Sequence, residues 1–309
     1  MRRRKRSLTA LAVALGLGVA AVAPGGAAVA DDTFEPQVQL YLAYAPVIYL
    51  TKGETKRPTN VGAFLQHAAL GWSHNACPDH QMASLGTVNA ASLGNGAYKH
   101  QATNSLCSHS GTAYASNQNV RPRESLTGAE GMYLDLDNGQ RGIGSVRAEL
   151  YYDYQKGDHI TYWFFYAYND GPLVQNHEGD WERISIKLSP ANQPLTVAYF
   201  RHGGSCVLSY PSVQKVGTHP VGYSALGTHA TYPRAGTYPT KFGFSDNATG
   251  GGEIWSTYAR PIYDVKTMPW YGFGGAWGEV GTISDTTGPR GPSAFKCPTP
   301  ASWTSPACY

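Results

Sequence analysis

Charged residues are scarce in this sequence: only 15% of its 309 residues are Asp, Glu, Lys or Arg. Tyrosine (21), glycine (36) and proline (20) are plentiful instead. This balance disfavours long helices and favours strands joined by turns. The chain also has no Gly-x-Ser-x-Gly elbow, no phosphate-binding loop, no convincing pair of catalytic acids and no internal repeat, so the common signatures of hydrolases and nucleotide-binding proteins are missing.

A run that is both long and apolar occurs only at the N-terminus. Residues 2–6 are basic, residues 7–22 are apolar and small, and a small-residue cleavage pattern ends at Ala30. We therefore predict a signal peptide over residues 1–30 and a secreted protein, with residues 31–309 as a single β-sandwich domain. A membrane anchor is the alternative, but the apolar segment is short and rich in alanine and glycine.

The basic excess of the chain belongs mainly to this leader. The whole sequence has 24 basic and 21 acidic residues, and removing the five basic residues of the leader leaves 19 against 21, a net charge of −2. A slightly acidic mature chain gives no reason to expect nucleic-acid binding. The oligomeric state is left open by the sequence.

Five cysteines follow the leader, and in an oxidising compartment pairing is the default. Proximity in the sequence favours the pairs Cys77–Cys107 and Cys297–Cys308. Cys206 would then be a spare thiol, although spacing alone does not fix connectivity.

The predicted fold class is all-β: a β-sandwich with long loops and one or two short helices. Residues 45–50 and 183–188 read as strands, and residues 146–154 and 160–168 read as a hairpin. A short helix is predicted over residues 61–70, with Asn60 near its N-cap. The polar stretch 71–130 is predicted to be a long loop region, which is often functional when it occurs in a compact domain.

The acidic stretch 169–182 carries the strongest functional pattern. In the strand that follows, Ile184 and Leu188 share one face, and the same period places Asp180 and Glu182 on it. Ionised carboxylates beside an apolar row are costly unless a cation or hydrogen-bond donors neutralise them.

We therefore predict a divalent metal site formed by Asp170, His177, Asp180 and Glu182. Oxygen ligands with one imidazole suit Mg²⁺, Ca²⁺ or Mn²⁺. The absence of a cysteine or a second histidine nearby argues against structural zinc. The alternative is a strand end whose carboxylates are paired with arginines.

Three further residues are candidates for the rim of this site. Glu178 lies within the acidic stretch, and His202 and His229 each stand where a strand gives way to a turn. Because strand-end loops cluster on a sandwich, these histidines could approach the acidic stretch.

Several motifs resemble the vacuolar protein sorting-associated protein 62 family of fungi, plants and actinobacteria. They lie at residues 44–50, 64–69, 162–166, 176–182, 219–221, 227–233, 269–278 and 288–292. This resemblance covers most of the chain after the leader and implies the fold more than the activity.

Residues 176–182 also resemble, more distantly, the heptapeptide Gly-His-Arg-His-Asp-Trp-Glu of the necrosis- and ethylene-inducing peptide-like cytolysins. Asn replaces Gly, Glu replaces Arg and Gly replaces the second His, while His177, Asp180 and Glu182 match. The nearest match to the upstream Asp of those cytolysins is Asp170. The resemblance implies a divalent metal in a β-sandwich and binding of sphingolipid sugar headgroups at a membrane.

Three functions follow as expectations. The first is a secreted binding or toxin-like protein whose metal engages a cell-surface glycan or glycolipid headgroup. The second is a metal-dependent hydrolase of glycosidic or phosphoester bonds, with Glu178 or His229 as the base. The third is a purely structural metal that fixes the loop to the sheet.

Overall fold

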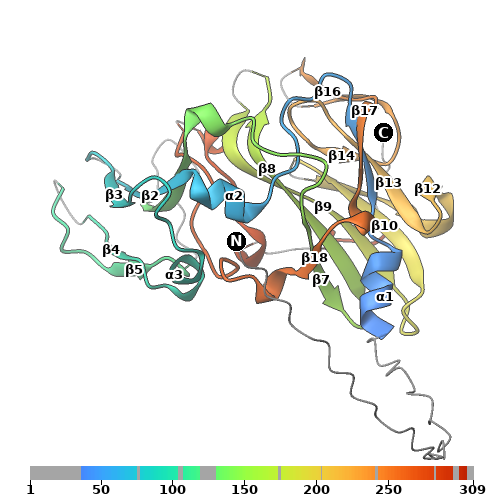
Figure 1. Cartoon of the computed structure of the whole chain (residues 1–309), viewed down its shortest axis with the longest axis horizontal. Coiled ribbons are helices and arrows are strands. Elements are labelled where there is room, and N and C mark those ends of the chain that lie inside the picture. Colours follow the sequence, from blue (N-terminus) through green and yellow to red (C-terminus); the bar gives the residue numbers. More distant parts are fainter. Residues whose placement is uncertain are drawn as a thin grey trace, which may run out of the picture. The chain divides into compact units, whose positions relative to one another are not determined.

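The computed structural model describes residues 36–74, 77–103, 107–118, 130–172, 175–202, 204–240, 243–281, 283–294 and 299–304. The predicted signal peptide lies outside these residues. Within them the chain is built mainly of strands, which confirms the all-β prediction (Figure 1). The α-helices are short: α1 (Pro36–Ala43), α2 (Val61–Gln66) and α3 (Ala90–Asn95). No helix among the described residues has the length and apolar character needed to cross a bilayer.

The largest sheet has six strands in the order β11-β10-β9-β8-β7-β18. All neighbours are antiparallel except β18, which runs parallel to β7. The strand bounds are β7 (Leu150–Gln155), β8 (His159–Asp170), β9 (Asn176–Leu188), β10 (Pro194–Arg201), β11 (Gly204–Ser209) and β18 (Ile262–Asp264). The predicted hairpin is therefore present as β7 and β8.

A second sheet has the order β12-β13-β1-β17, with β14 also paired to β13. Its strands are β1 (Val47–Thr51), β12 (Lys215–Val216), β13 (His219–Ser224), β14 (Thr231–Tyr232) and β17 (Gly251–Ser256). Here β1 joins distant parts of the chain, since it runs parallel to β13 and antiparallel to β17.

Three smaller sheets complete the strand set, in the orders β3-β2-β6, β4-β5 and β15-β16. Their bounds are β2 (Ala68–Ser73), β3 (His80–Ala83), β4 (Lys99–Gln101), β5 (Ala113–Ala115), β6 (Gly131–Leu136), β15 (Gly236–Pro239) and β16 (Ser245–Ala248). Short 3₁₀ helices lie at Asn138–Gln140, Tyr210–Ser212, Thr257–Ala259, Val265–Thr267, Ser284–Thr286 and Pro292–Ala294.

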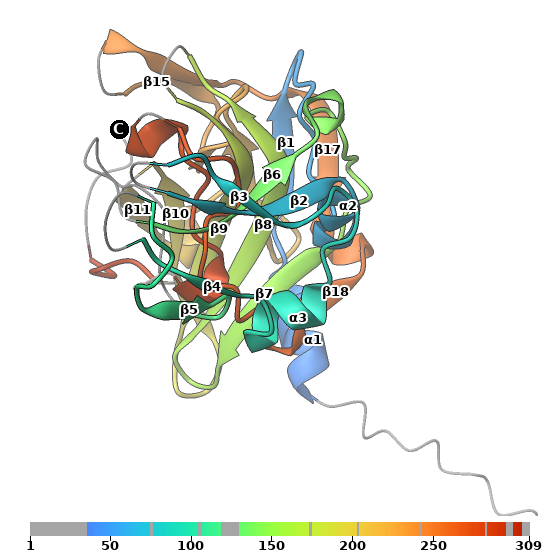
Figure 2. The same ribbon diagram turned by 90° about the vertical axis from the view of Figure 1, so that its left-hand side faces the viewer.

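The six-stranded sheet has a core on each face. On one face Phe164 and Ile184 pack with Ile48 and Trp255 of the second sheet, which makes the sandwich. On the other face Trp163, Phe165 and Trp181 pack with the side chains of α2, β2, β6 and the 270–277 segment. Figure 2 shows β2, β6 and α2 in front of β8 and β9. Strands buried on both faces read as continuous apolar runs, and this explains the unbroken aromatic stretch of β8.

Two predicted elements differ from the observed ones. The helix expected over residues 61–70 ends at Gln66, because Ala68–Ser73 pairs as β2 with β6. Asn60 does occupy the N-cap position, but its side chain accepts a hydrogen bond from the Glu149 backbone N–H instead of capping the helix. The stretch 71–130, expected to be a loop, contains β3, α3, β4 and β5 in its described parts.

The cysteines follow the sequence prediction in part. Cys77 and Cys107 form a disulfide with a Cα–Cα distance of 5.6 Å, as predicted. The prediction that Cys206 is a spare thiol is wrong, because Cys206 is disulfide-bonded and fully buried. The predicted Cys297–Cys308 pair lies outside the described residues.

Candidate functional site

The strand β9 has the phase that its alternation predicted. Ile184 faces the core between the two large sheets, whereas Trp181 belongs to the opposite core. Asp180 is opposite Tyr166 of β8, and Glu182 is opposite Phe164, and both aromatic partners line the inter-sheet core. The two carboxylates, which we call the acidic pair, therefore share one face at the end of an apolar row.

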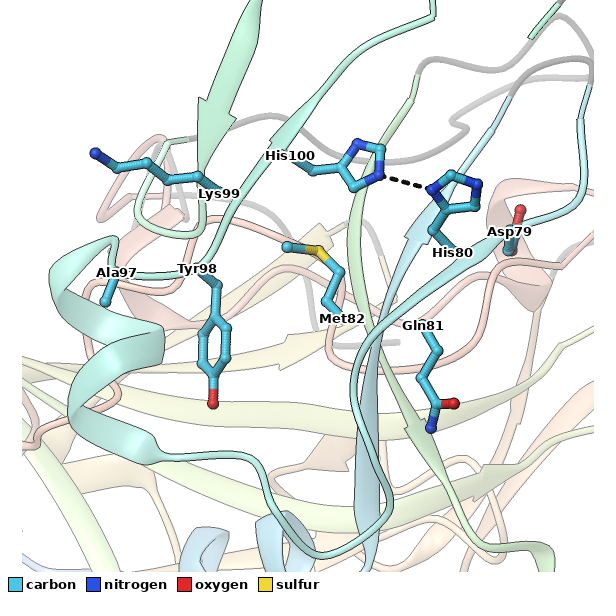
Figure 3. A pocket seen from close by; sticks show the side chains of 8 residues that line it. All are labelled: Asp79, His80, Gln81, Met82, Ala97, Tyr98, Lys99 and His100. Atoms are coloured by element: carbon cyan, nitrogen blue, oxygen red, sulfur yellow. Dashed lines mark hydrogen bonds between the residues drawn. The ribbon is translucent and has the colours of Figure 1, made fainter. Parts of the chain in front are cut away.

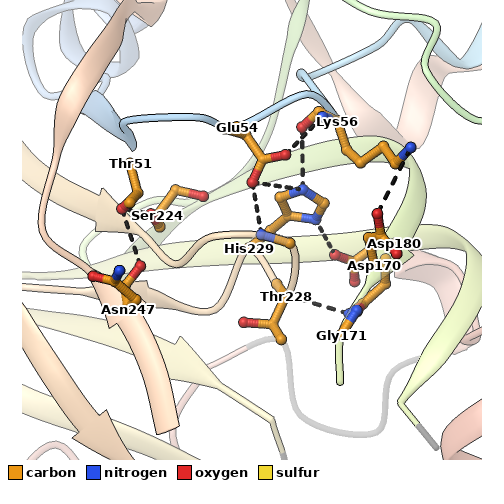
Figure 4. Close-up of polar contacts among 12 residues, drawn as sticks. Thr51, Glu54, Lys56, Asp170, Gly171, Asp180, Ser224, Thr228, His229 and Asn247 are labelled. Atoms are coloured by element: carbon orange, nitrogen blue, oxygen red, sulfur yellow. Dashed lines mark hydrogen bonds and ion pairs between the residues drawn. The ribbon is translucent and has the colours of Figure 1, made fainter. Parts of the chain in front are cut away.

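Asp180 is buried and bound to a buried histidine (Figure 4). Its Oδ2 lies 2.9 Å from Nδ1 of His229, and Nε2 of the same ring lies 3.1 Å from the Lys56 carbonyl oxygen. Both ring nitrogens therefore face hydrogen-bond acceptors. The ring also stacks on Tyr166, with centroids 3.8 Å apart and an interplanar angle of 3°.

Glu54 completes this network from the segment after β1. One of its oxygens accepts a hydrogen bond from the Gly227 backbone N–H (2.7 Å) and the other from the Lys56 N–H (2.6 Å). Glu54 Oε2 also lies 3.8 Å from Nε2 of His229. His229 thus holds the 226–230 turn against β9 and against the segment after β1. It lies inside the protein, whereas the sequence predicted it at the rim of the site.

Asp246 of β16 forms a second polar centre beside the acidic pair. It accepts hydrogen bonds from the hydroxyls of Thr228 (2.8 Å) and Tyr232 (2.7 Å), and its Oδ2 lies 2.8 Å from Nε2 of His202. Burial raises the pKa of the Asp246 carboxyl, but these partners outweigh it and bring the pKa below its usual value. His202, predicted at the rim, is therefore an ion-pair partner of Asp246.

The pKa of Glu182, unlike that of Asp246, stays above its usual value. Although the residue is only half-buried, the desolvation of its carboxyl raises the pKa well above the usual value, and the negative charges of Asp180 and Asp246 raise it further. The charge of Arg183 opposes this shift without cancelling it. The position consequently favours either a bound proton or a bound cation.

The other predicted ligands are engaged elsewhere. Asp170 is half exposed, with Oδ2 3.8 Å from Nζ of Lys56. Nδ1 of His177 lies 3.0 Å from the Gly179 carbonyl oxygen. Of the predicted four, Asp180 and Glu182 form the acidic pair, whereas Asp170 and His177 have other contacts. The alternative of carboxylates paired with arginines also differs from the structure at Asp180, whose partner is a histidine.

Glu178 points to the other side of β9. It is buried, accepts a hydrogen bond from the Leu136 backbone N–H (2.9 Å), and forms an ion pair with Arg141 at 3.1 Å. Burial, more than any neighbouring group, raises its pKa. Its oxygens are committed to holding β6 and Arg141, which does not fit the rim position predicted for it.

Two groups of side chains in the described part of the chain could hold a metal ion, and neither is the predicted set. One is acidic and consists of Asp135, Glu178 and Glu279. The other consists of His74, His80, His100 and His109, which we call the four-histidine cluster. Four of the ten histidines of the chain fall within 36 consecutive residues, and this density was the signal in the sequence that could have indicated the cluster.

The four-histidine cluster gathers around two short contacts between rings. Nδ1 of His80 lies 3.0 Å from Nε2 of His100, and Nε2 of His109 lies 3.2 Å from Nε2 of His74. Burial, with the neighbouring histidines, lowers the pKa of His74 and of His100. These rings are therefore biased toward the neutral form, which is the form that binds metals.

An open pocket of about 560 Å³ adjoins this cluster (Figure 3). Its walls carry carboxylate, amide, ammonium, phenol and imidazole groups next to apolar side chains. The lining residues are Asp79, His80, Gln81, Met82, Ala97, Tyr98, Lys99 and His100. Such a mixture can hydrogen-bond a polar ligand while an aromatic ring packs against it.

Part of this chain matches a known protein family. Residues 167–244 match the family model described as vacuolar protein sorting-associated protein 62, so the chain carries a domain of that family, as the motifs predicted. This domain contains the acidic pair, His202 and His229. A curated relative is the putative vacuolar protein sorting-associated protein TDA6 of Saccharomyces cerevisiae, 25% identical over 163 residues. That match covers 38% of this chain and 35% of the yeast protein, so this chain spans about a third of the length of that relative.

Two solved structures of necrosis- and ethylene-inducing proteins are distantly similar. Necrosis and Ethylene inducing Protein 2, from the causal agent of cocoa's Witches Broom disease, is 12% identical, with 74% of this chain and 73% of that chain covered and a TM-score of 0.32. NLPPya in complex with glucosamine is 10% identical, with 75% of each chain covered and a TM-score of 0.30. Both TM-scores are low, so the likeness is distant.

Proposed function

We propose that this is a secreted, divalent-metal-binding β-sandwich protein that recognises the headgroup of a cell-surface glycan or glycolipid. The observation that carries the ligand half of the proposal is the open pocket lined by Asp79, Gln81, Tyr98 and Lys99. Sugars present hydroxyl groups and flat apolar faces together. A pocket with a carboxylate, an amide, an ammonium and a phenol offers a partner for each of these features.

The metal half of the proposal rests on the acidic pair. Glu182 lies in the field of Asp180 and Asp246, and the opposing charge of Arg183 does not cancel the rise in its pKa. A hard cation such as Ca²⁺, Mg²⁺ or Mn²⁺ would relieve that repulsion. Because the acidic pair lies on the face between the two large sheets, this ion would stabilise the sandwich, while the pocket on β3 and β4 would contact the ligand.

The hydrolase alternative receives less support. Its two candidate bases were Glu178 and His229, and both are buried with their polar atoms occupied. A general base needs a free position within hydrogen-bond reach of the attacking water. Neither side chain offers one, so binding is the function that the geometry supports better.

We expect Glu182→Gln to raise the melting temperature at pH 8 by about 2–4 °C, equivalent to about 1 kcal/mol in a chain of this size. The folded state holds the Glu182 proton more tightly than the unfolded state, because its folded pKa is raised. Stability contributed by this group is therefore lost as the pH rises above the ordinary carboxyl value of about 4.3. The variant should show a flatter profile of stability against pH, measured by thermal unfolding.

The same variant tests the metal. Millimolar Ca²⁺ or Mn²⁺ should raise the melting temperature of the wild type but not that of Glu182→Gln or Asp180→Asn. Glu253→Gln is the matched control, because Glu253 is an exposed carboxylate paired with Arg57. An equal response to the cation in all four proteins would show that no metal binds at the acidic pair.

The ligand is tested with arrays of immobilised glycans and glycolipids. We expect the wild type to bind a defined set of headgroups, and Lys99→Ala and Gln81→Ala each to weaken binding about tenfold, the effect of one lost polar contact of about 1.4 kcal/mol. Lys156→Ala, which removes an exposed lysine between β7 and β8, should bind normally. Absence of binding by the wild type, or equal binding by all variants, would contradict the proposal.

A further inference from the structure

We propose that His74, His80, His100 and His109 bind a single Zn²⁺ or a chemically similar transition-metal ion. This site is separate from the acidic pair and does not depend on the proposed ligand. The four histidines come from different places: His74 directly follows β2, His80 begins β3, His100 lies in β4, and His109 lies between β4 and β5.

The spacing of the ring nitrogens fits a tetrahedral ion. One nitrogen from each ring lies within 4.8 Å of the other three. The two shortest separations are 3.0 Å, between His80 and His100, and 3.2 Å, between His74 and His109. In a tetrahedral zinc site with Zn–N bonds of about 2.0–2.1 Å, neighbouring nitrogens are about 3.3–3.4 Å apart. The two shortest pairs would move slightly apart, and the wider pairs closer together, to admit the ion.

Two of the rings are already oriented for coordination by their other nitrogen. Nδ1 of His100 lies 2.6 Å from the Gln101 carbonyl oxygen, so it carries the proton and leaves the Nε2 lone pair free. Nδ1 of His74 lies 2.7 Å from Oγ1 of Thr103 and 4.0 Å from Glu130. The Thr103 backbone N–H in turn donates to Glu130 at 2.7 Å. Metal-binding histidines usually have such carbonyl, hydroxyl or carboxylate partners.

The ligand type selects the metal. Imidazole suits Zn²⁺, Cu²⁺ and Ni²⁺, whereas Ca²⁺ and Mg²⁺ require oxygen ligands. Four protein ligands close a tetrahedral shell, which is typical of structural sites. The sequence argument against zinc applied to the acidic stretch, where a second histidine is lacking, and does not apply to this cluster.

The position of the cluster indicates what the ion would stabilise. The β4–β5 sheet has only two strands, and a two-stranded sheet is marginally stable by itself. The ion would tie it to β2 and β3, beside the Cys77–Cys107 disulfide that joins the same segments. Removal of the metal should therefore loosen the region between residues 77 and 118 without unfolding the sandwich.

The test uses the secreted full-length chain without a histidine tag. We expect one equivalent of zinc by elemental analysis, and tight binding in a titration against a competing chelator. His100→Ala should weaken zinc binding by more than about 100-fold, since partners of the ligands alone are worth about 10–100-fold. With Co²⁺ in place of zinc, the visible spectrum should be that of a tetrahedral site. Chelation should speed proteolysis between residues 77 and 118.

Three further variants are controls for this test. His159→Ala removes a histidine outside the cluster, on β8, and should bind zinc like the wild type. Because His100 also stacks on Trp72, Thr103→Val provides a variant that retains all four ligands and should bind zinc about tenfold more weakly. Failure of the wild type to retain zinc at micromolar free metal, or equal affinity in His100→Ala and His159→Ala, would overturn the site. Lys99→Ala should leave zinc affinity unchanged, which separates this proposal from that of the glycan ligand.

Discussion

Replacing Gly179 with alanine is expected to reduce the free energy of unfolding by about 3–5 kcal/mol. Gly179 has a φ of +56°, a conformation that costs an ordinary residue about 1–2 kcal/mol. An added Cβ would also lie 1.8 Å from the carbonyl oxygen of Trp277, which packs in the core against Phe165 and Trp181. Either β9 or the Trp277 segment would have to move, and the aromatic packing would be lost with it.

The measurement is thermal unfolding, in which the melting temperature should fall by about 6–20 °C. Gly62→Ala is the control, because Gly62 lies in α2 and a Cβ there meets nothing within 4 Å. Alanine favours a helix over glycine by about 1 kcal/mol, so this variant should be as stable as the wild type or more so. A Gly179→Ala protein within 2 °C of the wild type would mean that β9 and Trp277 are not in the close contact described.

The sequence predicted the parts of the fold that depend on local pattern. The alternation after Glu182 gave the correct face for Asp180, Glu182 and Ile184 of β9, because the period of a strand is fixed by its geometry. The alternation did not show that both faces of β8 and β9 are buried. That property depends on which distant segments cover the sheet, and the 270–277 segment carries no local signal for it.

The candidate site was harder to predict for the same reason. Asp180 and His229 are 49 residues apart, and their contact requires the turn at residues 226–230 to fold against β9. Local spacing instead grouped Asp170 and His177 with Asp180, although the chain turns these side chains toward other partners. The four-histidine cluster comes from four different segments, so no short motif marks it.

His229→Ala is expected to reduce the free energy of unfolding by about 3–5 kcal/mol, because it removes the partner of a buried carboxylate. Asp180 is only 5% exposed, so losing its partner at 2.9 Å would leave a carboxylate without water or a donor to replace it. The variant also loses the ring stacked on Tyr166. Unfolding by urea at pH 7 measures the change.

A double-mutant cycle separates the charge from the packing. If Asp180 is costly in His229→Ala because its charge is unpaired, then Asp180→Asn should destabilise the wild type but restore part of the stability of His229→Ala. His229→Asn should lose less than His229→Ala, since asparagine tolerates the left-handed φ of +56° and can still donate to Asp180. His67→Ala, at the C-cap of α2, is the control histidine. Additive effects of Asp180→Asn and His229→Ala would mean that the two side chains are not coupled, and the network that fixes the acidic pair would lose its central contact.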